Sequence, residues 1–416
     1  MKINKWTQML VGVGLISIPA VACAEEKQQN FVQTALSSTT LSGYIDTTAD
    51  WSFGTGNANL PGRVYDGPDT QDGFNLNVVS LTLNKPLDES EWAAGYNVQM
   101  LLGPGAAKRG TALTASFNPV TGVSSSEVSF NEAVALLRVP VGNGIDFKIG
   151  QFGTFNGYEA YDTYKDPNWS RSYGFYIESS AHTGVAASYK FTEWMSAQVG
   201  VGNMAGFNNQ VDAKYPGAES KKAYLAMVTF TAPESFGFLK GATLSAGYTG
   251  GVNGGVTSVP TYGNSWMQDN YYVGASIPTP LKNLSAGIAF DYTTGINFPD
   301  SYAEAVAVYL SYQATEKLKV NTRADWANGS NGTLGASNGV FGYEAATAGH
   351  NELFSLTTTA DYSLWANVIS RLELRWDTCL TGDNPFGGEV AATPGVPLVG
   401  GKKNYVSLNL NIIYMF

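Results

Sequence analysis

Residues 404–416 read NYVSLNLNIIYMF and alternate between apolar and polar side chains almost to the last residue. The apolar positions are Val406, Leu408, Leu410, Ile412, Tyr414 and Phe416, and the residues between them are polar through Asn411. Because successive side chains of a β-strand point to opposite faces, the stretch predicts a strand with one apolar face and one polar face. We expect the aromatic pair that closes it, Tyr414 and Phe416, to act as a C-terminal signal for membrane insertion.

The same alternation recurs along the chain in segments of about ten residues, which is typical of a transmembrane β-barrel. We expect sixteen strands, at residues 40–52, 74–84, 92–102, 126–139, 145–152, 183–190, 195–202, 222–231, 242–250, 270–277, 284–293, 302–312, 318–326, 352–362, 368–380 and 404–416. Short turns alternate with long polar loops, which indicates periplasmic turns and extracellular loops. The predicted fold is therefore all-β, a transmembrane antiparallel barrel of about sixteen strands; fourteen and eighteen stay open, since the connection 232–241 is long.

Composition narrows the class of protein further. The 416 residues carry a formal net charge of −10 and show no basic stripe, which argues against a nucleic-acid partner. Charged residues make up 14% of the chain, below the roughly 25% of soluble domains. No apolar run long enough for a membrane helix follows residue 24, so a helical membrane protein is excluded. A soluble secreted β protein remains the alternative to a barrel.

The N-terminus has the features of a secretory signal peptide. Lys2 and Lys5 precede an apolar stretch at residues 9–21, and Ala22 and Ala24 flank Cys23 in a small-x-small cleavage site. We therefore expect a signal peptide at 1–24, a short periplasmic segment at 25–39 and the barrel at 40–416. Lipidation of Cys23 stays open as an alternative. Cleavage after Ala24 would leave Cys379 as the single cysteine, without a disulfide or a cysteine-based metal site.

A central stretch carries a family resemblance. It contains KIGQFGT at residues 148–154, GYE at 157–159, DPNWSRS at 166–172 and HTGV at 182–185, and RLELRWD follows at 371–377. These motifs resemble the Putative beta-barrel porin-2 (OmpL-like) family of bacterial outer-membrane proteins. The resemblance extends over nearly all of the chain after the signal and implies a general porin-like channel, with no particular solute.

Alternation also assigns faces to the strands. With the apolar residues towards lipid, six charged side chains of two strands face inward: Arg323, Asp325, Arg371, Glu373, Arg375 and Asp377. The opposite assignment would place arginines in lipid at about 2–4 kcal/mol each. One strand does not fit a single phase, because Glu132 would then face lipid. A β-bulge near Asn131 would turn Glu132 and Arg138 inward.

The connection at residues 153–180 is the best candidate for a loop that narrows the barrel. It combines tyrosines with charges, and its candidate constriction residues are Tyr158, Glu159, Asp162, Lys165, Asp166 and Arg171. Acids of the loop opposite wall arginines would create a transverse field that selects solutes by charge. The alternative is an ordinary surface loop with solvated charges.

A porin for passive diffusion of small hydrophilic solutes and ions is the favoured function. A channel specific for a sugar or an apolar compound, and a structural or adhesive barrel, are the alternatives. We expect no enzymatic activity, cofactor or metal site, since the two histidines, His182 and His350, lack a recognisable catalytic triad. The expected location is the outer membrane of a Gram-negative bacterium. The expected partners are outer-membrane lipid, the barrel-assembly machinery and, by analogy with barrels of this size, two further copies in a homotrimer.

Overall fold

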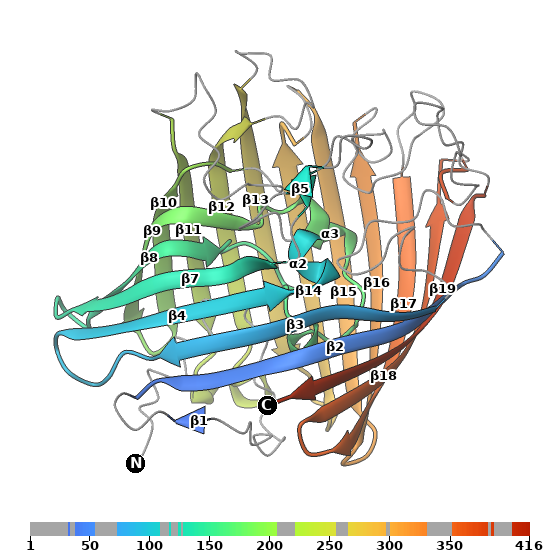
Figure 1. Cartoon of the computed structure of the whole chain (residues 1–416), viewed down its shortest axis with the longest axis horizontal. Helices are drawn as coiled ribbons and strands as arrows, with labels where there is room; N and C mark the ends of the chain where they lie inside the picture. The colour runs from blue at the N-terminus through green and yellow to red at the C-terminus, as the bar shows by residue number, and fades with distance from the viewer. Residues whose placement is uncertain are drawn as a thin grey trace.

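The computed structural model describes residues 32–33, 38–54, 73–108, 116–117, 124–125, 128–205, 221–254, 265–296, 300–330, 352–381, 384–386 and 402–416. Sixteen antiparallel strands close into one barrel (Figure 1). Their bounds are β2 (Thr40–Ser52), β3 (Gly73–Lys85), β4 (Ala93–Leu102), β7 (Val128–Val139), β8 (Ile145–Gly153), β9 (Ala181–Thr192), β10 (Met195–Gly202), β11 (Ala223–Thr231), β12 (Thr243–Gly254), β13 (Ser265–Pro278), β14 (Leu284–Thr294), β15 (Tyr302–Gln313), β16 (Leu318–Gly329), β17 (Glu352–Trp365), β18 (Val368–Cys379) and β19 (Asn404–Met415).

The other elements are short. They are β1 (Val32–Gln33), α2 (Pro104–Lys108), β5 (Ser116–Phe117), β6 (Ser124–Ser125), η1 (Thr163–Lys165), α3 (Tyr173–Ile177) and η2 (Glu234–Leu239). Within the described ranges, no helix is long and apolar enough to cross a membrane. The predicted signal peptide at 1–24 and most of the segment 25–39 lie outside the described residues, as do most of the long loops.

Closure of the barrel depends on the C-terminal strand. Strand β19 pairs with β18 on one side and with β2 on the other, so the sheet has no open edge between its first and last strands. Beyond the end of β19, the backbone N–H of Phe416 donates to Gly43 O at 3.0 Å, and Gly43 N–H donates to Phe416 O at 2.9 Å. The prediction of sixteen strands is confirmed, and fourteen and eighteen are excluded.

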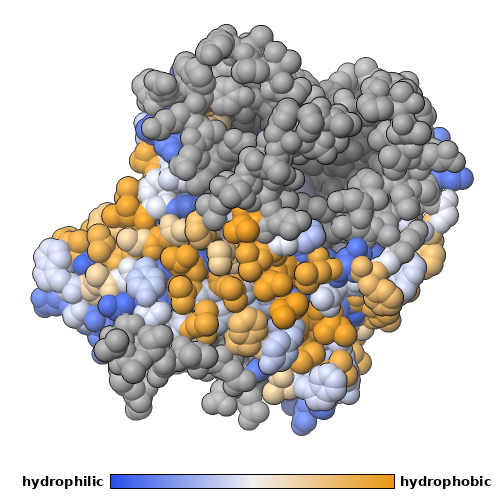
Figure 2. Space-filling model, in the orientation of Figure 1, coloured by the Kyte–Doolittle hydropathy of each residue, from blue (hydrophilic) through white to orange (hydrophobic). Residues whose placement is uncertain are grey.

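The two faces of the strands separate by polarity as the alternation predicts. On β18, Leu374 is 51% exposed on the outside, whereas Arg375 is 1% exposed on the inside. Figure 2 shows the outward apolar side chains as a band around the visible face of the barrel. Because lipid cannot hydrogen-bond to charged groups, this band requires the arginines to point inward.

Two β-bulges inside the strands adjust the faces locally, and two further register shifts among the described strands lie next to the turns that follow β9 and β17. Gln99 of β4 pairs with Glu132 of β7, and Met100 pairs with Phe130, which leaves Asn131 as the extra residue. The predicted bulge near Asn131 is confirmed. A second bulge at Asn77 in β3 was not predicted from the sequence.

Candidate functional site

The connection between β8 and β9, residues 154–180, lies inside the barrel. Its residues hydrogen-bond to inward-facing side chains of β2, β4, β13, β14, β16, β17 and β18. Helix α3 of this segment packs against β14, β15 and β16. Most of the segment is buried, although its sequence is rich in polar residues. We call residues 154–180 the inner loop.

Small inward-facing residues of the wall make room for the inner loop. Gly287 of β14 lies under the Tyr158 side chain, and a Cβ at Gly287 would stand 2.0 Å from the Tyr158 hydroxyl oxygen. Ala289 and Ala307 belong to the same buried cluster. The Tyr158 ring stacks on Tyr309 with centroids 4.2 Å apart. Stacking and shape complementarity therefore fix this side of the loop to the wall.

Arg171 organises the inner loop from within. Its guanidinium donates to the carbonyl oxygens of Ala160, Tyr161 and Trp169, each at 2.8 Å. It also lies 3.2 Å from the Asp166 carboxylate. Burial raises the pKa of Asp166 to about 7, because desolvation outweighs the favourable charge of Arg171. The Arg171 side chain thus connects residues 160–161, early in the loop, with residues 166–171, later in the loop.

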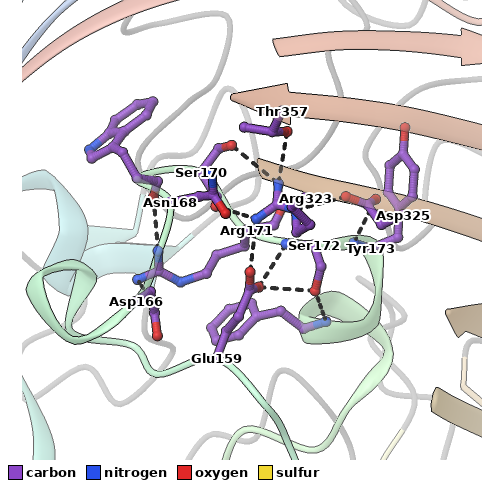
Figure 3. Close-up of polar contacts among 12 residues, drawn as sticks. Glu159, Asp166, Asn168, Ser170, Arg171, Ser172, Tyr173, Arg323, Asp325 and Thr357 are labelled. Carbon is purple, nitrogen blue, oxygen red and sulfur yellow. Dashed lines mark hydrogen bonds and ion pairs between the residues drawn. The ribbon is translucent and has the colours of Figure 1, made fainter. Parts of the chain in front are cut away.

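Arg323 of β16 joins the inner loop to the wall (Figure 3). Its guanidinium bonds to Glu159 and to Asp325, both at 2.8 Å. It also donates to the carbonyl oxygens of Ser170 at 2.6 Å and Arg171 at 3.0 Å. Since every one of these groups is buried, the contacts have little competition from water.

The four charged residues of β18 also bind the inner loop. Arg371 donates to Thr163 O at 2.8 Å and Arg375 donates to Arg171 O at 2.6 Å. Glu373 accepts the backbone N–H groups of Trp169 and Ser170, at 2.7 and 3.0 Å. Asp377 accepts the Tyr173 hydroxyl at 2.6 Å. The predicted inward-facing charges therefore bind the backbone of the loop as much as its side chains.

The far side of the inner loop contacts β2 and β4. Asp162 accepts from the Tyr44 hydroxyl and from Gln99 Nε2, both at 2.8 Å, and from Lys165 Nζ at 2.7 Å. Burial alone would raise the pKa of Asp162, but Lys165 and these hydrogen bonds outweigh it and hold the pKa below its usual range. Asp162 is therefore a stable anion under the lysine.

The structure brings most of the predicted site residues together in one contact region. Glu159 meets a wall arginine, whereas Asp162 and Asp166 bond to Lys165 and Arg171 of their own loop. The pairs Glu159–Arg323 and Asp166–Arg171 are in direct contact and buried on both sides, whereas Asp162 is buried under a partly exposed Lys165. We call the buried charges of the loop and the wall the ion-paired seam: Glu159, Asp162, Asp166, Arg171, Arg323, Asp325, Arg371, Glu373, Arg375 and Asp377. The expected placement of loop acids opposite wall arginines describes Glu159 and Arg323, whereas the carboxylates of Asp162 and Asp166 pair within the loop.

The alternation of residues 40–52 places Tyr44 and Asp46 inward without identifying them as partners of the loop, and Gln99 and Glu178 were not singled out from the sequence. Tyr44 and Gln99 bind Asp162, and Asp46 accepts the Thr163 hydroxyl at 2.5 Å. Glu178 of the loop lies against the Asp291 carboxyl of β14. A run of inward-facing small residues on neighbouring strands was the available signal for where the loop packs: Gly287, Ala289, Ala303, Ala305 and Ala307.

Known structures share this architecture. The outer-membrane channel DcaP of Acinetobacter baumannii is 12% identical, with a TM-score of 0.57, and the alignment covers 92% of this chain and 99% of that one. OmpF of Salmonella typhi is 11% identical, with a TM-score of 0.56 and coverage of 91% and 97%. The trimer form of OmpT of Vibrio cholerae is 11% identical, with a TM-score of 0.54 and coverage of 91% and 99%. At such identities the likeness concerns the fold.

No curated protein matches the sequence significantly. The family model described as Putative beta-barrel porin-2, OmpL-like matches residues 38–412, which is nearly the whole barrel. Family and fold are those of a channel rather than an enzyme. The chain therefore belongs to the Putative beta-barrel porin-2, OmpL-like family and is an outer-membrane porin for passive diffusion.

Proposed function

We propose that this porin passes small hydrophilic solutes and ions through a passage that the inner loop narrows. The observation that carries the proposal is the attachment of residues 154–180 to inward-facing side chains on strands distributed around the wall. A sixteen-strand barrel is wide enough for an aqueous channel, so an inward loop is what limits the size of a solute.

The inward faces of the strands support an aqueous interior. Beside the buried seam, partly exposed polar side chains face inward on neighbouring strands: Asn97, Asp146, Lys148, Ser188, Ser196 and Gln198. Polar side chains of this kind compensate a passing solute for water that it loses. The buried stacking of Tyr158 on Tyr309 leaves neither ring face free for a sugar.

The test is planar-bilayer recording on the purified protein and on a variant in which residues 158–176 are replaced by a short Gly-Ser linker. We expect steady ohmic steps from the wild type and larger steps from the variant. Replacing the exposed η2 turn, residues 234–239, by a Gly-Ser linker is the matched control and should leave the step size unchanged. Absence of any conductance in the folded wild type would refute the channel. Equal steps from wild type and loop variant would refute the narrowing.

The site of action and the assembly are part of the same proposal. The protein would be exported, cleaved after Ala24, inserted by the barrel-assembly machinery into the outer membrane of a Gram-negative bacterium, and assembled as a homotrimer. Support comes from the family and from OmpT of Vibrio cholerae, which has a trimer form. N-terminal sequencing of the mature protein should begin at Glu25, and chemical crosslinking should stop at three copies.

A further inference from the structure

The charged residues of the inner loop differ in how much of each faces water. Five of the six are buried: Glu159, Asp162, Asp166, Arg171 and Glu178. The remaining one, Lys165, has a side chain that is 22% exposed. Lys165 is therefore the charged side chain of the loop that water and a passing solute reach most readily.

The position of Lys165 is fixed by its neighbours. Its Nζ lies 2.7 Å from Asp162 Oδ2, and the Asp162 side chain is 1% exposed. Asp162 is held in place behind the lysine by Tyr44 and Gln99. The ammonium group also lies 5.4 Å from the centre of the Tyr164 ring. The cation is thus the outer member of the pair and the carboxylate is the recessed one.

The wall of the barrel repeats the arrangement on β7 and β8. Lys148 Nζ lies 2.7 Å from Glu132 Oε1, with the lysine side chain 24% exposed and the glutamate side chain 9% exposed. Asn97 donates to the other carboxylate oxygen of Glu132 at 2.7 Å. Gln99, which donates to Asp162 at 2.8 Å, is the residue of β4 that pairs with Glu132 of β7. The loop lysine and the wall lysine therefore share one region of the interior.

Coulomb attraction falls with distance and with the polarity of the medium between the charges. An anion in the water beside this region reaches the two partly exposed lysine side chains, whereas the carboxylates paired with them are almost fully covered. The nearby Arg138–Asp146 pair adds no such bias, since its partners are about equally exposed, at 13% and 12%. The net charge of −10 does not contradict this attraction, because several of the acids that contribute to it are buried in the seam.

We propose that Lys165 and Lys148 form an anion-attracting site in the passage, so that the porin favours small anionic solutes over cations. The proposal rests on the channel function proposed above and names the charge class that the channel selects. Lys165 stays charged at physiological pH: burial opposes its charge, but Asp162, Tyr164 and Glu132 outweigh burial and raise its pKa.

The experiment is the reversal potential of the purified protein in a planar bilayer under a KCl gradient. We expect the wild type to favour chloride. The Lys148→Gln, Lys165→Gln variant should show a chloride-to-potassium permeability ratio lower by roughly threefold or more, and the effect should weaken at high salt because ions screen the site. Lys165→Arg should retain the wild-type ratio.

Lys240→Gln is the matched control, since Lys240 lies on the η2 turn and pairs with Glu234 away from the inner loop. Heat-modified migration on gels shows that each variant is folded. The single variant Lys148→Gln leaves the loop lysine in place, so its permeability ratio tests the site even if loss of Lys165 disturbs the loop. A cation-selective wild type, or folded variants with an unchanged ratio, would overturn the anion site and leave the diffusion channel intact. A wild type without conductance would instead remove the proposed function itself.

Discussion

Replacing Arg323 by methionine tests whether buried ion pairs hold the inner loop against the wall. Methionine keeps much of the length of the side chain and removes its five hydrogen-bond donors. The change leaves the carboxylates of Glu159 and Asp325, and the carbonyl oxygens of Ser170 and Arg171, without the guanidinium. Removing one partner of a buried ion pair costs about 3–5 kcal/mol, because the other charge stays buried without compensation.

The structure places the expected cost near the lower end of this range. Glu159 would keep the backbone N–H and the hydroxyl of Ser172, at 2.7 and 2.9 Å. Asp325 would keep the hydroxyl of Ser355 at 2.9 Å. A loss of about 3 kcal/mol shifts the equilibrium between the docked and the released loop by roughly a hundredfold, at about 1.4 kcal/mol per factor of ten.

Hydrogen–deuterium exchange with mass spectrometry measures this shift. Peptides that contain Trp169, Ser170 and Ser172 report on amides bonded to buried carboxylates. We expect exchange there to become roughly a hundredfold faster in Arg323→Met, with strands β9 and β10 unchanged. Removing the orphaned charge as well, by Glu159→Gln, should restore part of the protection. Unchanged exchange of the loop in a folded Arg323→Met protein would refute the view that this arginine holds the loop.

Three further predictions follow from other parts of the barrel. Burial and the neighbouring Asp291 raise the pKa of Glu178 well above its ordinary value of 4.5, so docking of residues 173–180 should weaken as the pH rises from 4.5 towards the raised pKa. Hydrogen exchange, corrected for its intrinsic pH dependence, should show this weakening in the wild type and a smaller one in Glu178→Gln, where the buried Asp291 remains. Gly43→Ala places a Cβ 2.7 Å from Phe416 Cζ and 2.2 Å from Ser80 O, and should destabilise the folded barrel by about 1–3 kcal/mol in urea titrations; an unchanged midpoint would contradict the close approach. Leu374→Arg should cost about 2–4 kcal/mol in the same assay, and a neutral result would place Leu374 away from lipid.

The barrel was predictable because its signal is local and repeated. The predicted bounds of the strands at 40–52 and 195–202 agree with the structure at both ends. Their faces were predictable as well, since a shift by one residue would bring polar side chains into lipid. The bulge at Asn131 was predictable because a strand without it would place the charged side chain of Glu132 in lipid. The bulge at Asn77 was missed, although the outward positions change phase across it: Leu76 and Leu83 are exposed, whereas Val78 is buried. No charged side chain marked the change, and Asn77 itself turns inward and bonds Asp46 at 2.7 Å.

The contacts of the inner loop were less predictable, because they join residues far apart in sequence. Charge and length identified residues 153–180 as the segment of interest, but partners such as Glu159 and Arg323 are set by the packing of the whole loop. Sequence also does not reveal which member of an ion pair is recessed. That property distinguishes Lys165 from Asp162, and it depends on Tyr44 and Gln99 of strands that precede the loop.

Arginines and lysines have different roles inside this barrel: the arginines bind the buried loop, and the two lysines of the proposed site stay partly exposed to water. Most of the inner loop lies outside helix and strand, so its buried carbonyl groups need donors from elsewhere. A guanidinium offers several donors in a planar fork and can satisfy carbonyls and carboxylates at once, as four side chains here do: Arg171, Arg323, Arg371 and Arg375. An ammonium group is strongly hydrated and loses more on burial, so Lys165 and Lys148 remain partly in water. Replacing either lysine by arginine therefore preserves the charge that meets the solute, whereas replacing an arginine of the seam by lysine leaves loop carbonyls without partners.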